Sequence, residues 1–320
     1  MVAVLFCCPG TIDVTAAYLK ARKEAENISI FDENSRRIAV IGGDEREQVA
    51  AARLAAAGYR VYCYGRPQTA LAAGVRYAAT AAEALEHAGA LILPQIPLLN
   101  ERIYNAEGAE LVLSAEEWHL AAGALLLTGR ETPYLRQLAA EHRLRIAAVA
   151  ADARLLQLSS RATAEAALAI TVRQHPGMVQ GSRVLVLGCG ALGLELIAVL
   201  TALGADVEAT NRSEARLPAA EAAGAAIVPW LSWRDRLAEY DLIYNTVPAP
   251  MLGEAELRRL RGSALIVDLA SRPGGTDFAA AERLGKKALL ELGLPGKYAP
   301  QAMGAALAEL FVRHLEQEEI

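Results

Sequence analysis

Three glycines after a short apolar run have the spacing of a phosphate-binding loop. Residues 184–187 read Val-Leu-Val-Leu, and Gly188, Gly190 and Gly193 follow as G-x-G-x-x-G, before a stretch with apolar helical periodicity. In this context the first glycine permits a tight turn, the second lets the backbone approach a pyrophosphate, and the third lets helix and strand pack closely. The anion would lie at the helix amino terminus, where free N–H groups and the helix dipole favour negative charge. We therefore predict a dinucleotide site, with a purely structural glycine turn as the alternative; its loop comprises Gly188, Cys189, Gly190, Ala191, Leu192 and Gly193.

The residues about 20 positions past this loop indicate which nucleotide is preferred. An NAD site usually offers Asp or Glu to the ribose hydroxyls there, whereas this sequence has Asn211, Arg212 and Ser213 after Thr210. An acid would repel a 2′-phosphate, while a guanidinium and a hydroxyl would bind one. The charge pattern favours NADP over NAD, although Arg212 is also compatible with a solvated side chain that opens the next helix.

No side chain stands out as a catalytic acid, base or metal ligand. Four histidines fall in charged amphipathic segments, and His175 precedes a proline at a helix end. The four cysteines show no metal-ligand spacing. Cys189 lies where a helix amino terminus could lower the pKa of its thiol, but a small residue in a tight turn is the simpler interpretation. The sequence predicts no metal site and leaves the catalytic residues unassigned.

Two series of alternating strands and helices would position these residues. Apolar runs predict strands over residues 38–41, 60–64, 90–94, 124–128 and 145–149, and a second set over residues 183–187, 206–210, 225–228, 242–247, 264–269 and 287–290. An alanine-rich helix over residues 163–174 separates the two sets. A closing helix is expected over residues 301–315, and its position at the end of the chain allows it to pack back across the domain junction. The pattern predicts an α/β protein with two doubly wound parallel-sheet domains joined by a linker helix, the second a Rossmann dinucleotide-binding domain. The predicted parts are an amino-terminal extension (1–35), a substrate-side domain (36–160) and a nucleotide-binding domain with the closing helix (161–320).

Composition argues against several other classes of protein. The 320 residues are 53% apolar but 5% aromatic, and 32 basic and 37 acidic side chains give a net charge of −5. No basic run or aromatic-interleaved basic patch is present, which argues against a nucleic-acid partner. The amino terminus lacks the basic residues and cleavage site of a signal peptide, and no apolar stretch reaches the roughly 18 residues of a membrane helix. We expect a cytoplasmic protein with no membrane partner.

Four further segments resemble one family. They are residues 37–46 (Arg-Ile-Ala-Val-Ile-Gly-Gly-Asp-Glu-Arg), 245–248 (Asn-Thr-Val-Pro), 268–277 (Asp-Leu-Ala-Ser-Arg-Pro-Gly-Gly-Thr-Asp) and 293–300 (Gly-Leu-Pro-Gly-Lys-Tyr-Ala-Pro). From about residue 37 to the carboxyl terminus, the chain resembles the A subunit of dipicolinate synthase. The resemblance implies pyridine-nucleotide-linked oxidation of dihydrodipicolinate, or of its hydrated precursor, to dipicolinate for endospore formation in the mother cell of a sporulating bacterium. It also implies a flavoprotein-like partner, the B subunit of dipicolinate synthase, and a homo-oligomer is compatible with it.

Loops at the carboxyl ends of predicted strands are expected to line the site, because ligands of open α/β sheets bind beyond those ends. The loop residues assigned to the nucleotide are Asn245, Thr246, Val247 and Pro248. For a small cyclic substrate with two carboxylates, the candidate cations are Arg272 and Lys297, with Arg46 from the first domain. Thr128 and Gly129 could add a hydroxyl and an N–H group. A solvated surface charge is the alternative for each cation taken singly.

The sequence departs from the family at the linker helix. The family's Pro-Thr-Ala-Glu-Gly pattern is replaced by Ala-Thr-Ala-Glu-Ala at residues 162–166, which bears on how closely a substrate approaches the start of that helix. Two other functions stay open: a dehydrogenase of the alanine or 2-hydroxy-acid type, and a nucleotide-binding regulatory subunit whose chemistry resides in a partner. The lack of a well-placed histidine in the second domain counts against the first of these.

Overall fold

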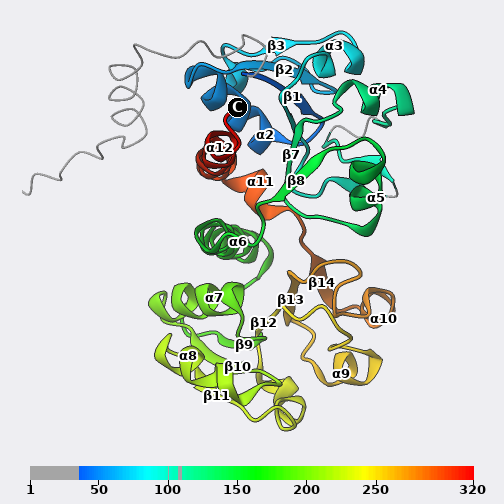
Figure 1. Cartoon of the computed structure of the whole chain (residues 1–320). Helices are drawn as coiled ribbons and strands as arrows, with labels where there is room; N and C mark the ends of the chain where they lie inside the picture. The colour runs from blue at the N-terminus through cyan, green and yellow to red at the C-terminus, as the bar shows by residue number, and fades with distance from the viewer. Residues whose placement is uncertain (1–35, 100, 107–109) are drawn as a thin grey trace, which may run out of the picture.

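Parallel β-sheets form the centres of two domains that lie one above the other in Figure 1. The computed structural model describes residues 36–99, 101–106 and 110–320, so the predicted extension over residues 1–35 lies outside them. The first sheet has the strand order β3-β2-β1-β4-β7-β8. Its strands are β1 (Arg37–Ile41), β2 (Arg60–Tyr64), β3 (Arg76–Tyr77), β4 (Ala90–Ile92), β7 (Leu125–Thr128) and β8 (Arg145–Ala148).

The second sheet repeats this order as β11-β10-β9-β12-β13-β14, and every neighbouring pair in both sheets is parallel. Its strands are β9 (Arg183–Leu187), β10 (Asp206–Thr210), β11 (Ala226–Ile227), β12 (Leu242–Asn245), β13 (Leu265–Asp268) and β14 (Lys287–Leu290). In each sheet the strand order reverses beside the first strand, and in open α/β sheets ligands bind at such switch points. The predicted pair of doubly wound domains is confirmed.

Alternating side chains of the central strands enter two separate cores, because successive residues of a strand point to opposite faces. In β1, Ile38 and Val40 lie in one core and Ala39 and Ile41 in the other. The same alternation divides β9 between its two cores. Helices cover both faces; they are α2 (Glu45–Ala56), α3 (Ala81–Leu85), α4 (Ala115–Leu120), α5 (Pro133–Glu141), α7 (Ala191–Ala202), α8 (Leu217–Ala222), α9 (Glu254–Arg259) and α10 (Phe278–Arg283).

The chain crosses between the domains twice. It first crosses through α6 (Ala153–Gln174), whose Leu155 and Ala162 pack in the first domain and whose Ile170 packs in the second. The helix begins at residue 153 rather than at the predicted residue 163, because the side chain of Asp152 caps it by accepting a hydrogen bond from Leu155 N. Residues 162–166 therefore lie inside the helix, not at its start.

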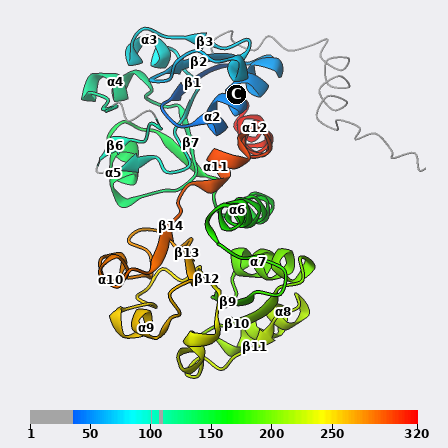
Figure 2. The same cartoon turned by 180° about the vertical axis from the view of Figure 1, so that it is seen from behind.

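The second crossing follows β14 and leads through α11 (Leu294–Tyr298) into α12 (Pro300–Gln317). Figure 2 shows α12 beside α2, and its buried residues Met303, Leu307 and Phe311 belong to a core of the first domain. Gly304 permits this packing, since a Cβ there would lie 2.5 Å from the Cβ of Val49. The closing helix, counted with the second domain in the sequence, thus packs back across the junction on the first domain, as one of the two expectations for it allowed, and it contacts residues about 250 positions away along the chain.

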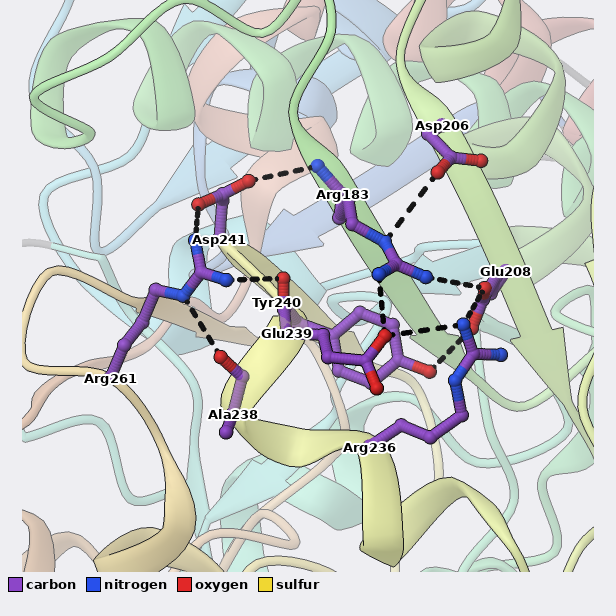
Figure 3. A network of polar contacts seen from close by, with 9 residues as sticks. All are labelled: Arg183, Asp206, Glu208, Arg236, Ala238, Glu239, Tyr240, Asp241 and Arg261. Atoms are coloured by element: carbon purple, nitrogen blue, oxygen red, sulfur yellow. Dashed lines mark hydrogen bonds and ion pairs between the residues drawn. The ribbon is translucent and has the colours of Figure 1, made fainter.

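A network of charged side chains joins the opposite, amino-terminal edge of the second sheet (Figure 3). The buried Glu208 carboxylate of β10 receives Arg183 Nη2 at 3.2 Å and Arg236 Nη2 at 2.7 Å. The hydroxyl of the fully buried Tyr240 donates to Glu208 Oε2 at 2.6 Å, and burial together with this hydrogen bond raises the pKa of Tyr240. The backbone N–H of Arg183 donates to Asp241, which also accepts from Arg261. The network therefore links β9 and β10 with the segments that precede β12 and β13. It lies at the edge of the sheet opposite the strand ends expected to bind ligand.

Removing the Glu208 carboxylate should destabilise the second domain without affecting its opposite edge. Glu208→Ala leaves the buried Tyr240 hydroxyl without its acceptor and two arginines without their shared partner, which should lower the free energy of unfolding by about 2–3 kcal/mol. Asp206→Ala is the matched control, since Asp206 pairs with Arg183 at 3.5 Å and is 61% exposed; it should cost less than about 1 kcal/mol. Denaturant unfolding of both variants measures the difference, and equal losses would contradict the role given to Glu208.

Candidate nucleotide and substrate site

Close packing surrounds two of the three glycines of the loop. Gly188 has φ +100°, and a Cβ there would lie 2.4 Å from Thr246 Oγ1. A Cβ at Gly193 would lie 2.0 Å from the carbonyl oxygen of Gly188, so only glycine lets α7 pack this closely on the end of β9. Both glycines are required by the protein itself, whatever it binds.

Gly190 differs from the other two because its side faces open space. It is the N-cap of α7 and provides no side-chain cap, and only Arg216 Nη1 comes within 4 Å of a Cβ placed there, at 3.7 Å. Its backbone dihedrals, φ −82° and ψ −174°, are accessible to any residue. The fold therefore has no need of glycine at residue 190, whereas a phosphate group approaching the free N–H groups of α7 would need one.

Asn211 braces the glycine loop from the end of β10. Its Oδ1 accepts a hydrogen bond from Cys189 N at 3.1 Å, and its Nδ2 donates to the carbonyl of Ser213 at 2.9 Å. The Cys189 thiol is buried, and burial raises its pKa even though the charge of Arg216 acts in the opposite direction. Cys189 is thus a small packing residue rather than a reactive thiol.

Two arginines stand beside this loop. Arg212 and Ser213 follow β10 and are exposed, as a contact with a nucleotide phosphate requires. Arg216 is the N-cap residue of α8, and its guanidinium lies next to Gly190. Arg216 was not predicted from the sequence; the available signal was a second arginine four residues past Arg212, at the start of the next helix.

In the Asn-Thr-Val-Pro segment after β12, the first two residues make internal hydrogen bonds and the last two lie closer to the surface. Thr246 Oγ1 donates to the carbonyl of Leu187 at 2.9 Å and so holds the end of β9. The buried Asn245 donates through Nδ2 to Asp268 Oδ1 at 3.0 Å and accepts at Oδ1 from Val247 N. Val247 is half-buried and Pro248 is exposed. Of the four residues assigned to the nucleotide, Asn245 is turned into the protein, Thr246 braces the glycine loop from a half-buried position, and Val247 and Pro248 lie at the surface.

The buried Asp268 organises the loops around this segment. Its carboxylate accepts four hydrogen bonds, from Asn245 Nδ2, Ala270 N, Gly275 N and Thr276 Oγ1. A Cβ at Gly275 would lie 2.5 Å from Asn245 Nδ2, so the glycine-rich turn is pressed against the Asn-Thr-Val-Pro loop. Asp277 caps the next helix by accepting a hydrogen bond from Ala280 N.

The first domain has the same switch point, but a segment of its own chain fills it. The backbone N–H of Gly43 donates to the carbonyl of Tyr104, and Asn105 Nδ2 donates to the carbonyl of Gly65. The side chain of Leu111 reaches within 2.4 Å of a Cβ placed at Gly65 and 3.1 Å of one at Gly42. Residues that surround the β5–β6 hairpin (β5, Leu98–Leu99; β6, Arg102–Ile103) thus occupy the space at the ends of β1 and β2, whereas only Arg216 comes near a Cβ placed at Gly190 in the second domain.

A cluster of three charged residues begins α2 at this filled switch point. Asp44 is the N-cap and receives the guanidinium of Arg46 at both carboxylate oxygens, with Nη2 2.7 Å from Oδ2 and Nε 2.9 Å from Oδ1. Burial alone would raise the pKa of Asp44, but the hydrogen bonds and charge of Arg46 outweigh it and lower that pKa. Burial and the neighbouring Asp44 charge raise the pKa of Glu47 to about 7. The Asp-x-x-Glu capping pattern directly after a strand and two glycines was the missed sequence signal for Glu47.

The structure distributes the predicted substrate residues unevenly. Arg272 and Lys297 are exposed and follow the adjacent strands β13 and β14. Arg46 is only 11% exposed and lies under α11, since a Cβ at Gly296 would be 2.9 Å from its Nε. Thr128 is fully buried and donates to the carbonyl of Pro94 at 3.0 Å, and a Cβ at Gly129 would lie 2.3 Å from the carbonyl oxygen of Gln95. Thr128 and Gly129 therefore hold the loop after β4 and do not face a ligand.

Both sheets direct their carboxyl ends toward the junction between the domains. The end of β8 leads into α6, the end of β14 leads into α11, and these two helices pack against each other (Figure 1). Within the described ranges no group of His, Cys, Asp and Glu side chains could hold a metal ion. Within the same ranges no helix is long and apolar enough to cross a membrane.

Fold and loop together define a two-domain protein of the oxidoreductase type with a Rossmann second domain. Residues 37–150 match the model for the N-terminal domain of the dipicolinate synthase A subunit, and residues 148–283 match that for the alanine dehydrogenase/PNT C-terminal domain. The dipicolinate synthase A subunit of Bacillus subtilis (strain 168) is 30% identical over 289 residues, which cover 88% of this chain and 96% of that protein. The chain belongs to the family of dipicolinate synthase A subunits.

Solved structures of the same family agree with this assignment. The dipicolinate synthase A subunit of Bacillus halodurans aligns with a TM-score of 0.80 and 26% identity, covering 88% of this chain and 98% of that one. The A chain of dipicolinate synthase from Bacillus subtilis aligns with a TM-score of 0.76 and 29% identity, covering 88% and 97%. The resemblance found in four short segments of the sequence therefore extends over both domains.

Gly190→Val should abolish nucleotide binding and leave the fold intact. The open space beside Gly190 accommodates a branched side chain, which would then block the approach of a phosphate to the start of α7. Gly193→Val is the contrasting variant, because its side chain would collide with the Gly188 carbonyl and the protein should unfold. Thermal melting and fluorescence titration with NADPH measure both effects. Retained NADPH binding in Gly190→Val would refute the assignment of this loop to a nucleotide.

Proposed function

We propose that this protein is the A subunit of a dipicolinate synthase and oxidises dihydrodipicolinate, or its hydrated precursor, to dipicolinate with NADP as the hydride acceptor. The observation that carries the proposal is the open, uncapped start of α7 at Gly190, with the Arg216 guanidinium beside it, in a chain of this family. The flavoprotein-like B subunit of the synthase would be its partner, in the cytoplasm of a sporulating bacterium.

The residues around the second switch point suit a dinucleotide. Free N–H groups at the start of α7 can accept the pyrophosphate, and Val247 and Pro248 at the surface can pack against the nucleotide across the switch point from Gly190. A bound nicotinamide nucleotide supplies the group that takes a hydride from the ring carbon of the substrate. The protein has to hold the donor carbon and the acceptor in contact and remove one proton, because oxidation of dihydrodipicolinate to the aromatic ring releases a hydride and a proton. The hydrated precursor would lose one water molecule in addition.

The proposed substrate carries two carboxylates. Each carboxylate needs a cation or N–H groups in place of its water, because desolvating an unpaired charge is costly. The exposed Arg272 and Lys297 follow neighbouring strand ends of the second domain and can reach a ligand there. Arg46, already paired with Asp44, would contribute from the first domain only as part of that pair.

NADPH should bind more tightly than NADH, and the two arginines should contribute differently. Arg212 follows β10 at the position of the ribose-binding residue, so Arg212→Ala should weaken NADPH roughly tenfold and NADH little. Arg216 lies beside Gly190, where the pyrophosphate passes, so Arg216→Ala should weaken both nucleotides by a similar factor. Fluorescence titration of the two variants with both nucleotides tests this. Equal affinity of the wild type for NADH and NADPH would refute the preference for NADP.

Turnover with the proposed substrate tests the function itself. With enzymatically generated dihydrodipicolinate and NADP, absorbance at the NADPH maximum should rise, and Lys297→Ala should raise the KM for the dicarboxylate roughly tenfold while NADPH affinity is unchanged. The exposed Arg173, in the last turn of α6, provides the matched control variant, Arg173→Ala, which should match the wild type.

Repeating the assay with and without the B subunit separates the alternatives. Activity of the chain alone supports the proposal, whereas activity that appears only in a mixture, and survives Gly190→Val, identifies the chain as a regulatory subunit. Rapid oxidation of alanine or a 2-hydroxy acid instead of the dihydropyridine would assign it to the alanine dehydrogenase type.

A further inference from the structure

Two loops at the carboxyl edge of the first sheet are held against each other. One follows β4 and contains Pro94 and Gln95, and the other includes Thr128 and Gly129 at the end of β7. The Thr128 hydroxyl donates to the carbonyl of Pro94 at 3.0 Å, and a Cβ at Gly129 would lie 2.3 Å from the carbonyl oxygen of Gln95. The backbone N–H of Gln95 donates in turn to the buried Glu47 carboxylate at 3.2 Å. The next residue of each loop is therefore presented from a fixed backbone.

Those next residues are an exposed apolar side chain and an exposed cation. Ile96 follows Gln95 and is 49% exposed, and Arg130 follows Gly129 and is exposed as well. Because β4 and β7 are paired neighbours and their two loops touch, both side chains leave the same part of the sheet edge. A ring that carries a carboxylate needs these two kinds of contact, an apolar surface for the ring and a cation for the charge.

Arg130 makes no hydrogen bond or ion pair within the part of the chain that the structure describes. The carboxylate of the next residue, Glu131, is paired with Arg136 at 2.5 Å and does not neutralise Arg130. In contrast, Arg46 is 11% exposed and is held by both carboxylate oxygens of Asp44. A ligand carboxylate can therefore bind Arg130 without breaking an ion pair, whereas at Arg46 it would compete with Asp44.

The strand order brings the loop of Arg130 toward the cations of the second domain. β7 pairs with β8, which leads into α6, and β13, which Arg272 follows, pairs with β14, which leads into α11. Helices α6 and α11 pack against each other between the two sheets (Figure 1). Arg130 and Arg272 thus each follow a strand that lies about 4.8 Å from a strand leading into this helix pair, and Lys297 lies on α11 itself.

We propose that Arg130 binds the second carboxylate of the dicarboxylate substrate and that Ile96 packs against its ring. Arg272 and Lys297 bind the first carboxylate from the second domain. The proposal rests on the proposed function, which supplies the dicarboxylate. The first domain then contributes its cation from the end of β7 and not through Arg46. A ligand with two carboxylates connects the two domains, whereas a ligand with one carboxylate leaves the cations of one domain without a partner.

Two ligands that differ by one carboxylate test the proposal. Dipicolinate carries both groups, and picolinate (pyridine-2-carboxylate) carries one. The wild-type chain should bind dipicolinate roughly tenfold more tightly than picolinate, because a charge-assisted contact contributes about this factor. Arg130→Ala should bind dipicolinate about as weakly as picolinate, while its affinity for picolinate changes less than about twofold. Isothermal titration calorimetry of the full chain in the presence of NADPH measures both ligands.

Arg143→Ala is the matched control, since Arg143 is also exposed but precedes β8 at the opposite edge of the same sheet. This variant should keep the roughly tenfold selectivity for dipicolinate. Selectivity that survives in Arg130→Ala, or that is absent in the wild type, overturns the role of Arg130, while dipicolinate binding leaves the proposed function standing. Absence of dipicolinate binding to the wild type overturns the dicarboxylate site and the role of Arg130 together.

Combining Arg130→Ala with Lys297→Ala tests whether the two cations bind opposite carboxylates. Contacts at separate ends of a ligand contribute independently, so the double variant should bind dipicolinate roughly a hundredfold more weakly than the wild type. A double variant that binds dipicolinate as tightly as the weaker of the two single variants would put both cations on one carboxylate. That result overturns the assignment of Arg130 to the second carboxylate.

Discussion

The parallel arrangement of the strands governs where every candidate residue lies. Parallel strands require a crossover after each strand, and all their carboxyl ends gather at one edge of the sheet. Gly190, Arg212, Val247, Arg272 and Lys297 each follow a different strand end of the second sheet. Residues more than 100 positions apart in the chain therefore share one edge, and the opposite edge is left to the charged network around Glu208.

The two domains have the same strand order, but the space after the first strand is open in the second domain and filled in the first. In the second domain, glycine packing and the Asn211 brace keep the loop rigid while the space beside Gly190 stays open. In the first domain, Tyr104, Asn105 and Leu111 occupy the equivalent space, and the turn after β1 ends in a capping box of charged residues. The same topology thus leaves space beside the glycine loop in one domain and fills the equivalent space with side chains in the other.

The return of the chain to the first domain connects these two surfaces. Gly296 lies over the Asp44–Arg46 pair, and Gly304 brings α12 into close contact with α2. Helix α11, which carries Lys297, is therefore anchored on the first domain, although it follows a strand of the second. The Asp44–Arg46 pair therefore packs directly against the segment that bears Lys297.

The sequence alone determined the features that depend on neighbouring residues. Apolar runs that alternate with helical segments predicted the two doubly wound domains, because strand formation depends on a few neighbouring residues. The glycine spacing predicted the roles of Gly188 and Gly193, because a positive φ and close helix packing are also set within a few residues. Helix caps such as Asp277 were recognisable for the same reason. The four segments shared with dipicolinate synthase A subunits predicted the family from the sequence alone.

Only the tertiary structure decided the features that depend on burial and on contacts between distant segments. Thr128 looked available to a substrate, yet it is fully buried against Pro94; Arg46 looked like a free cation, yet Asp44 neutralises it under α11. Nothing in the sequence distinguishes Glu47 from the other acidic residues. Its pKa is raised by burial and by the neighbouring Asp44 carboxylate, and both depend on the folded structure. The placement of α12 on the first domain likewise required Gly304 and Val49 to meet, since an apolar helix face is compatible with either core until the packing is known.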